Sequence, residues 1–262
     1  MEKMSNTEMK NMFSLEGKVA VITGGAGSLG EGVAEGLALH GADIVVTGRT
    51  LKTLEETVKK VEAVGKRALA VVCDATNEDQ VEEMTKKVLE KFGKIDILVT
   101  VAGIAKRHPA EEFPLDEFQQ VLDINVTGTF ITCKAVGKVM KEQGYGKIIT
   151  VSSVRAFNGH PGGYAAYATS KGAVSILTKQ LATEWAKFGI NVNSVAPAIF
   201  WTPLTQEVLE DEKLKKIFLD RIPMGRAALV QDMVGATVFL GSSASDYING
   251  HVLPVDGGTV AG

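Results

Sequence analysis

Short apolar runs alternate along the chain with longer stretches in which apolar residues recur every three or four positions. The short runs are rich in β-branched residues and nearly continuous in hydrophobic character, which is typical of strands covered on both faces. We predict strands at residues 19–23, 43–47, 68–72, 95–99, 147–151, 191–195 and 251–255. The longer stretches have the period of helices, which we predict at residues 31–40, 51–64, 77–92, 115–142, 167–188 and 230–241.

Strand–helix alternation of this kind favours right-handed crossovers and a parallel sheet. Because no change in composition divides the chain, we expect one α/β domain over residues 13–262. It would be a doubly wound Rossmann-type fold, with a seven-stranded parallel sheet and helices on both faces. Residues 1–12 are polar and are expected to form a flexible leader. Residues 198–226 are the least regular part, and are interpreted either as a substrate lid or as an ordinary helical insertion.

Composition narrows the possible functions. The 262-residue chain has a net charge of −3 and no basic run, which argues against nucleic acid as a partner. No apolar run approaches the roughly 18 residues of a membrane span, and the start of the chain lacks the apolar core of a secretory signal. Cys73 and Cys133 lie in apolar stretches and are read as core residues in a reducing compartment. We expect a cytoplasmic protein that acts on a small molecule and has no metal site.

A glycine-rich loop joins the first predicted strand to the first helix. Residues 23–30 read T-G-G-A-G-S-L-G. Glycines at this point let the backbone turn sharply and approach a pyrophosphate, which then lies at the N-terminus of the helix. The candidate nucleotide-binding residues of the loop are Gly24, Gly27, Ser28, Leu29 and Gly30.

The end of the second strand bears on the choice of cofactor. An NAD enzyme has an acid there that binds the ribose 2′-hydroxyl, whereas this chain has Gly48 followed by Arg49. A guanidinium suits a 2′-phosphate as a forked, charged donor. We therefore favour NADP(H), with NAD(H) possible if Arg49 is only a solvated charge.

A tyrosine and a lysine four residues apart form the candidate catalytic pair. Tyr167 and Lys171 lie on one face of a predicted helix. A free phenol has a pKa near 10, and a nearby ammonium group and an oxidised nicotinamide are expected to lower it. Ser153, at the end of the fifth strand, can hold a substrate oxygen against the phenol. These residues predict proton transfer coupled to hydride transfer at an alcohol or carbonyl carbon.

The loop and the Y-x-x-x-K pattern together resemble the short-chain dehydrogenase/reductase family over residues 15–258. The resemblance implies a catalytic role for Asn125 as the support of a relay water. It also implies further cofactor contacts at Asp74, Ala75, Ala102, Gly103, Tyr167, Lys171, Pro197 and Thr202. The sequence departs from the family pattern at Ser28, Thr100, Val101 and Ala198. The V-D-G-G at residues 255–258 resembles a segment that often lies at a tetramer interface, which implies a homotetramer or a dimer.

Basic residues beside the expected crevice bear on the substrate. Arg107, Arg155 and His160 follow the fourth and fifth strands, where arginines could bind a carboxylate or could be solvated rim charges. Residues 107–118, R-H-P-A-E-E-F-P-L-D-E-F, are similar to the gluconate 5-dehydrogenases (5-ketogluconate reductases) within the family. The resemblance implies interconversion of a secondary alcohol and a ketone on a sugar acid or polyol, such as gluconate and 5-ketogluconate.

Other functions stay open at this level. Within the same class, a 3-oxoacyl-carrier-protein reductase would need a basic docking patch, and a hydroxysteroid or bile-acid dehydrogenase would need an apolar crevice wall. Phe200, Trp201 and Phe218 could supply such a wall. In a different class, a catalytically silent nucleotide-sensing regulator would be expected to lack Ser153, Tyr167 or Lys171, and all three are present.

Overall fold

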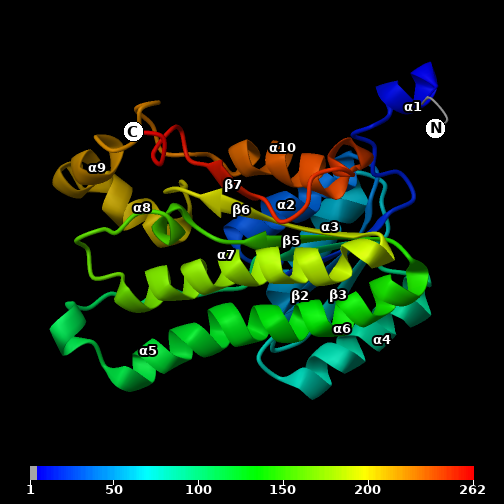
Figure 1. Ribbon diagram of the computed structural model, residues 1–262, viewed down its shortest axis with the longest axis horizontal. Coiled ribbons are helices and arrows are strands. Elements are labelled where there is room, and N and C mark those ends of the chain that lie inside the picture. The colour runs from blue at the N-terminus through cyan, green and yellow to red at the C-terminus, as the bar shows by residue number, and fades with distance from the viewer. Residues whose placement is uncertain (1–4) are drawn as a thin grey trace.

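The computed structural model describes residues 5–262, apart from the side chains of residues 203, 204, 207, 208, 213 and 214. Within this part of the chain, seven strands form a single parallel sheet in the order β3-β2-β1-β4-β5-β6-β7, as predicted (Figure 1). The strands are β1 Val19–Thr23, β2 Asp43–Gly48, β3 Ala68–Val72, β4 Ile97–Thr100, β5 Gly146–Val151, β6 Ile190–Pro197 and β7 Val252–Val255. The strand order reverses between β1 and β4, and in a sheet of this kind that point opens a crevice at the carboxyl ends of the strands.

Helices cover both faces of the sheet, and each face has its own hydrophobic core (Figure 1). One face packs against α2 Ser28–Leu39, α3 Leu51–Ala63 and α10 Val230–Gly241. The other packs against α4 Glu78–Phe92, α6 Gly128–Gln143 and α7 Ala165–Trp185. Cys73 and Cys133 are both buried in the second core as free thiols. Burial raises the pKa of the Cys133 thiol to about 12, so it behaves as an apolar core residue.

The predicted helix 115–142 is helical throughout, but it contains a π-helical turn that the prediction did not include. It consists of α5 Leu115–Leu122, a π-helical turn Asp123–Thr127 and α6. The wider turn is held by Asn125, whose amide bonds the backbone of Ile104 in the loop after β4. The backbone on both sides of the π-turn is helical, and the turn itself depends on a contact with a distant loop, so the local sequence pattern did not reveal it. Such turns occur often at functional sites.

The segments predicted as leader and lid both contain helices. The first contains the short helix α1 Asn6–Lys10, none of whose residues is buried. The second contains α8 Pro203–Glu210 and α9 Glu212–Leu219 (Figure 1). No helix within residues 5–262 is long and apolar enough to cross a membrane.

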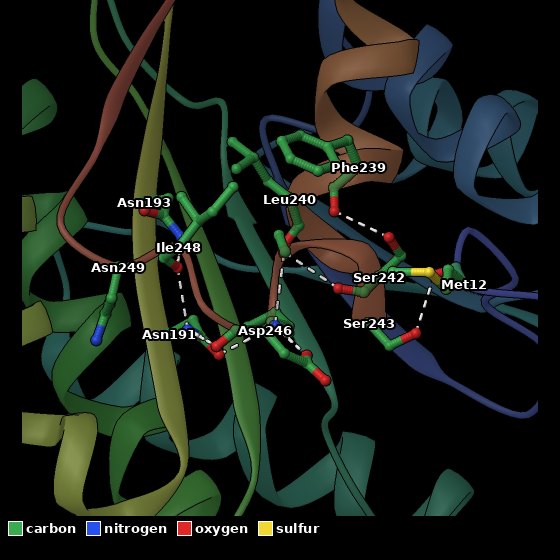
Figure 2. Close-up of polar contacts among 12 residues, drawn as sticks. Met12, Asn191, Asn193, Phe239, Leu240, Ser242, Ser243, Asp246, Ile248 and Asn249 are labelled. Atoms are coloured by element: carbon green, nitrogen blue, oxygen red, sulfur yellow. Dashed lines mark hydrogen bonds and ion pairs between the residues drawn. The ribbon is translucent and has the colours of Figure 1, made fainter. Parts of the chain in front are cut away.

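Polar side chains fix the edge of the sheet opposite the crevice. Figure 2 shows Asn191 and Asn193, on β6, beside the loop that leads from α10 to β7. Their amide nitrogens both donate to the Ile248 carbonyl, at 3.0 and 2.8 Å. Ser243 in the same loop donates to the Met12 carbonyl at 3.0 Å, which ties the start of the domain to its end. These contacts hold the loop before β7 against β6 and against the start of the domain.

Candidate active site

A cleft of about 1050 Å³ opens at the carboxyl ends of β1, β2, β3 and β4. Its volume suits an extended ligand of dinucleotide size. It contains most of the residues that the sequence predicted for the cofactor. These are Gly24, Gly27, Ser28, Leu29, Gly30, Arg49, Asp74, Ala75, Ala102, Gly103 and Thr202.

Two glycines of the loop between β1 and α2 are required by its geometry. Gly24 has a φ of +67°, and a Cβ there would lie 2.8 Å from the Ala102 amide nitrogen. A Cβ on Gly30 would overlap the Gly24 carbonyl. Gly27 has more room, since its nearest neighbour would be the Gly24 oxygen at 3.5 Å. Ser28, where the family pattern has glycine, opens α2 with a negative φ and does not disturb the turn.

The N-terminus of α2 is a site for an anion. Its N-cap is Gly27, and no side chain caps the first turn. The backbone N–H groups of Ser28, Leu29 and Gly30 therefore have no partner within the helix and lie at the wall of the cleft. The positive end of the helix dipole lies at the same point. This arrangement fits a pyrophosphate.

Arg49 lies exposed in the wall of the cleft at the end of β2. Asp74 lies in the same wall, after β3, and accepts hydrogen bonds from the Thr76 amide at 2.9 Å and hydroxyl at 2.8 Å. These bonds, with the charge of Arg49, hold the pKa of the Asp74 carboxyl below its usual value. The wall thus offers one oriented carboxylate and one guanidinium, as expected for an adenosine end that carries a phosphate.

Ser153 and Tyr167 lie together beside the cleft. Ser153 lies just after β5 and caps a short turn by accepting from the Arg155 amide. Tyr167 lies in the first turn of α7. Burial raises the pKa of the Tyr167 phenol, and the hydrogen bond to Ser153 acts in the opposite direction. The two hydroxyls are therefore within hydrogen-bonding distance of each other.

Lys171 lies one helical turn beyond Tyr167, with its ammonium 5.7 Å from the centre of the phenol ring. Its Nζ donates to the Val151 carbonyl at 2.7 Å, and burial lowers the pKa of Lys171 to about 8. Burial raises the pKa of the Tyr167 phenol above its usual value in this structure. The expectation that Lys171 and an oxidised nicotinamide together lower it stays a prediction.

Asn125 is buried between the loop after β4 and helix α7. Its Oδ1 accepts from the Ile104 amide at 2.8 Å, and its Nδ2 donates to Ser170 Oγ at 3.0 Å. A Cβ on Gly103 would lie 3.0 Å from Asn125 Oδ1 and 3.6 Å from Lys171 Nζ. The loop after β4 therefore passes directly over both side chains. Only glycine gives that close an approach.

The lowered pKa of Lys171 has a consequence for stability. The folded protein binds fewer protons at this site than the unfolded chain between pH 8 and 10.5, so this site destabilises the fold below pH 8 and ceases to do so as the pH rises. We expect urea unfolding of wild type and Lys171→Met to show a free-energy difference that shifts in favour of the wild type across that window. A difference independent of pH would contradict the assignment.

A smaller pocket of about 160 Å³ adjoins the two hydroxyls. Its wall contains Ser153, Tyr167 and three arginines: Arg107, Arg155 and Arg221. None of these guanidinium groups has an acidic partner among the residues that the structure describes. The pocket is thus rich in hydrogen-bond donors and unneutralised positive charge, which fits a carboxylate.

Tyr164 and Arg221 were missed by the sequence reasoning. The guanidinium carbons of Arg107 and Arg155 lie 5.3 and 6.0 Å from the centre of the Tyr164 ring, so this ring supports both cations. Arg221 follows α9 in the predicted lid. The only signal for it was a basic residue in an irregular segment beside the crevice.

His160 lies behind the pocket wall, not in it. Its ring stacks on Phe218 of α9 at 5.2 Å and 15°. Nδ1 accepts from the Gly162 amide at 3.0 Å, so the ring proton of the neutral form is on Nε2, which is buried without a partner. Burial and the three neighbouring arginines lower the pKa of His160 to about 4.

Pro197 and Ala198 lie where β6 ends. The Pro197 carbonyl accepts from Ser153 Oγ at 3.4 Å, and Pro197 is absent from the wall of the large cleft. Ala198 lines the smaller pocket, and Thr202 reaches the large one. The segment after β6 therefore contacts both cavities.

Comparison with known proteins places the chain among dehydrogenases. A family model described as enoyl-(acyl carrier protein) reductase (adh_short_C2) matches residues 24–260. The 2-dehydro-3-deoxy-D-gluconate 5-dehydrogenase of Dickeya dadantii is 44% identical over 96% of this chain and 98% of its own. The gluconate 5-dehydrogenase of Gluconobacter oxydans is 39% identical over 95% and 96%.

A solved structure has the same fold. The gluconate 5-dehydrogenase of Burkholderia cenocepacia, in complex with NADP and tartrate, superposes with a TM-score of 0.92. It is 36% identical, and the match covers 96% of this chain and 98% of that one. The fold predicted from the sequence is confirmed by this similarity.

Proposed function

Because the chain belongs to the short-chain dehydrogenase/reductase family, we propose that it interconverts a secondary alcohol and a ketone at C5 of a six-carbon sugar acid, with NADP(H) as cofactor. The observation that carries the substrate class is the group of three arginines beside Ser153 and Tyr167, none of which has an acidic partner among the described side chains. Relatives named for gluconate and for 2-dehydro-3-deoxy-D-gluconate share the C5 position and the carboxylate.

The catalytic residues would act on the substrate oxygen. Ser153 donates a hydrogen bond to this oxygen and holds it against Tyr167. In oxidation, the Tyr167 phenolate accepts the hydroxyl proton; in reduction, the phenol returns it to the oxygen. The nicotinamide, when bound, supplies or accepts the hydride. Asn125 and Lys171 lie directly under the loop at Gly103 and would hold this loop in place. Lys171 also lies close enough to the Tyr167 ring to stabilise the phenolate electrostatically.

The cofactor would lie in the large cleft. The free amides of the first turn of α2 suit its pyrophosphate, and Asp74 suits its adenosine. Arg49 suits the 2′-phosphate that distinguishes NADP from NAD. Three solved relatives contain bound NADP. Pro197, Tyr167 and Lys171 would complete the nicotinamide end.

Arg49→Gln should raise the Kd of NADPH about 10- to 100-fold, because one charged hydrogen-bond donor is lost. The Kd of NADH should change little, since NADH has no 2′-phosphate. Both constants can be measured by the quenching of protein fluorescence. Lys52→Gln, an equal charge loss at an exposed position of α3, is the matched control. Equal weakening of both nucleotides by Arg49→Gln would contradict the role of Arg49.

The wider family offers alternatives that the small pocket does not favour. A neutral sterol or a fatty acyl thioester has no charge to place against three guanidinium groups, although a bile acid has a carboxylate. The test is direct: 5-keto-D-gluconate, 2-dehydro-3-deoxy-D-gluconate, a sterol ketone and a 3-oxoacyl thioester are assayed with NADPH and NADH in parallel. Turnover of either sugar acid at C5, preferentially with the phosphorylated nucleotide, supports the proposal. Turnover of the sterol or thioester alone contradicts it.

We extend the proposal to the assembly and the compartment. Phe130 of α6 and Ile176 of α7 are 45% and 63% exposed, which suits burial against a second copy in a homotetramer or dimer. Two unreactive buried thiols suit the cytoplasm. Residues 198–226 would act as the substrate lid, and residues 1–12 as a leader outside the catalytic domain.

A further inference from the structure

The three arginines of the small pocket come from three separate segments. Arg107 follows β4, Arg155 lies in the turn after β5, and Arg221 follows α9. Like charges gathered in a pocket of about 160 Å³ repel one another, and no described acid neutralises them. Such an arrangement is favourable only when an anion joins it. The anion must then contact more than one segment.

The arginines differ in how they are supported. Arg107 and Arg155 both lie over the ring of Tyr164, so the body of the domain holds them. Arg107 and Arg221 are both exposed, but Arg221 has no ring contact of this kind among the described residues. It lies three residues after Phe218, on the segment that contains α8 and α9. The position of Arg221 therefore depends on how this segment is held against the body.

The contact between Phe218 of α9 and His160 holds the segment that contains Arg221 against the body of the domain. The two rings are stacked at 5.2 Å with an angle of only 15°, and His160 also meets Tyr164 edge-on at 5.4 Å. The imidazole is fixed on the body by the bond from the Gly162 amide. A continuous aromatic column thus leads from Tyr164, under two of the arginines, to Phe218, beside the third.

We propose that Arg221 is a specificity-determining residue that selects substrates with a carboxylate, and that His160 is the positioning residue that holds it at the pocket through Phe218. The inference rests on the proposed function, which supplies the sugar acid as substrate. It adds Arg221, within residues 198–226, as a residue that recognises the carboxylate of that substrate. A carboxylate can accept from two guanidinium groups at once. It would therefore join Arg221 to an arginine of the body.

The test compares binding of D-gluconate with that of its neutral analogue D-gluconamide, by calorimetry in the presence of NADPH, which cannot accept a hydride from either compound. The wild type should bind gluconate more tightly. Arg221→Gln should reduce the ratio of the two affinities about 10- to 100-fold. Lys216→Gln removes an equal charge from α9 at a side chain that is 76% exposed, and should leave the ratio as it is in the wild type.

The outcomes separate the inference from the function it rests on. A wild type that binds gluconate but keeps its preference in Arg221→Gln overturns the inference alone. A similar loss in Lys216→Gln also overturns it, since any positive charge on α9 would then suffice. A wild type that binds neither gluconate nor 2-dehydro-3-deoxy-D-gluconate overturns both.

The role of His160 is tested by rescue. His160→Phe keeps a ring to stack on Phe218, whereas His160→Ala removes it. We expect the alanine variant to lose several-fold of the preference for gluconate, and the phenylalanine variant to retain most of it, with equal Kd values for NADP⁺. If the two variants lose the preference equally, the stack does not position Arg221.

Discussion

Tyr167→Phe should lower kcat roughly 1000-fold, because general acid–base catalysis by a positioned side chain contributes about 10²–10⁴-fold. The variant keeps the ring and loses only the hydroxyl that exchanges the proton. The fold should persist, since Tyr167 contributes its packing through the ring. The measurement is kcat with a sugar acid and NADP⁺, together with the Kd of NADP⁺ from fluorescence.

Tyr247→Phe is the matched control, since it removes the same hydroxyl from a fully exposed ring on the far loop. Its kcat should equal that of the wild type. If Tyr167→Phe retained more than about a tenth of the wild-type kcat, the phenol would not be the proton-transfer group.

Gly30→Ala should raise the Kd of NADP⁺ roughly 100-fold or prevent the loop from forming. The added methyl group would overlap the Gly24 carbonyl, which belongs to the backbone and cannot move without opening the turn. The amides at the start of α2 would then lose their alignment. Calorimetric titration with NADP⁺ measures the effect.

Gly27→Ala provides the comparison, because the same methyl group would meet only ordinary contact at 3.5 Å and φ is −82°. Its Kd should stay within about threefold of the wild-type value. Equal losses in both variants would mean that the loop needs glycine for flexibility and not for space.

Much of the fold could be predicted from the sequence, because buried parallel strands leave a nearly continuous apolar run. All seven strands fall within a few residues of the predicted positions. The predicted ends of helices were less accurate where the backbone conformation of a single residue determines the end. Helix α2 begins at Ser28, earlier than residue 31, because Gly27 already ends the turn. The π-turn at Asn125 depends on contacts with Ile104, which is distant in sequence, so no local pattern reports it.

The candidate site was predictable where spacing carries the chemistry. Tyr167 and Lys171 lie on one helix, so their proximity follows from the helical period. Arg221, in contrast, reaches the pocket only because α8 and α9 fold back over it, and nothing local specifies that. His160 was assigned to the substrate from its loop, yet it supports the wall through Phe218. The pKa of Tyr167 likewise depends on how deeply the phenol is buried and on which charges lie near it, and neither follows from the local sequence.

The central claim is that Tyr167 becomes acidic enough to exchange a proton only beside an oxidised nicotinamide. Ultraviolet difference titration of the phenol, wild type minus Tyr167→Phe, measures it directly. Without nucleotide the transition should lie above the usual value near 10, because burial dominates. With saturating NADP⁺ it should fall by at least about one pH unit. A transition that does not move, or that rises, would contradict the account.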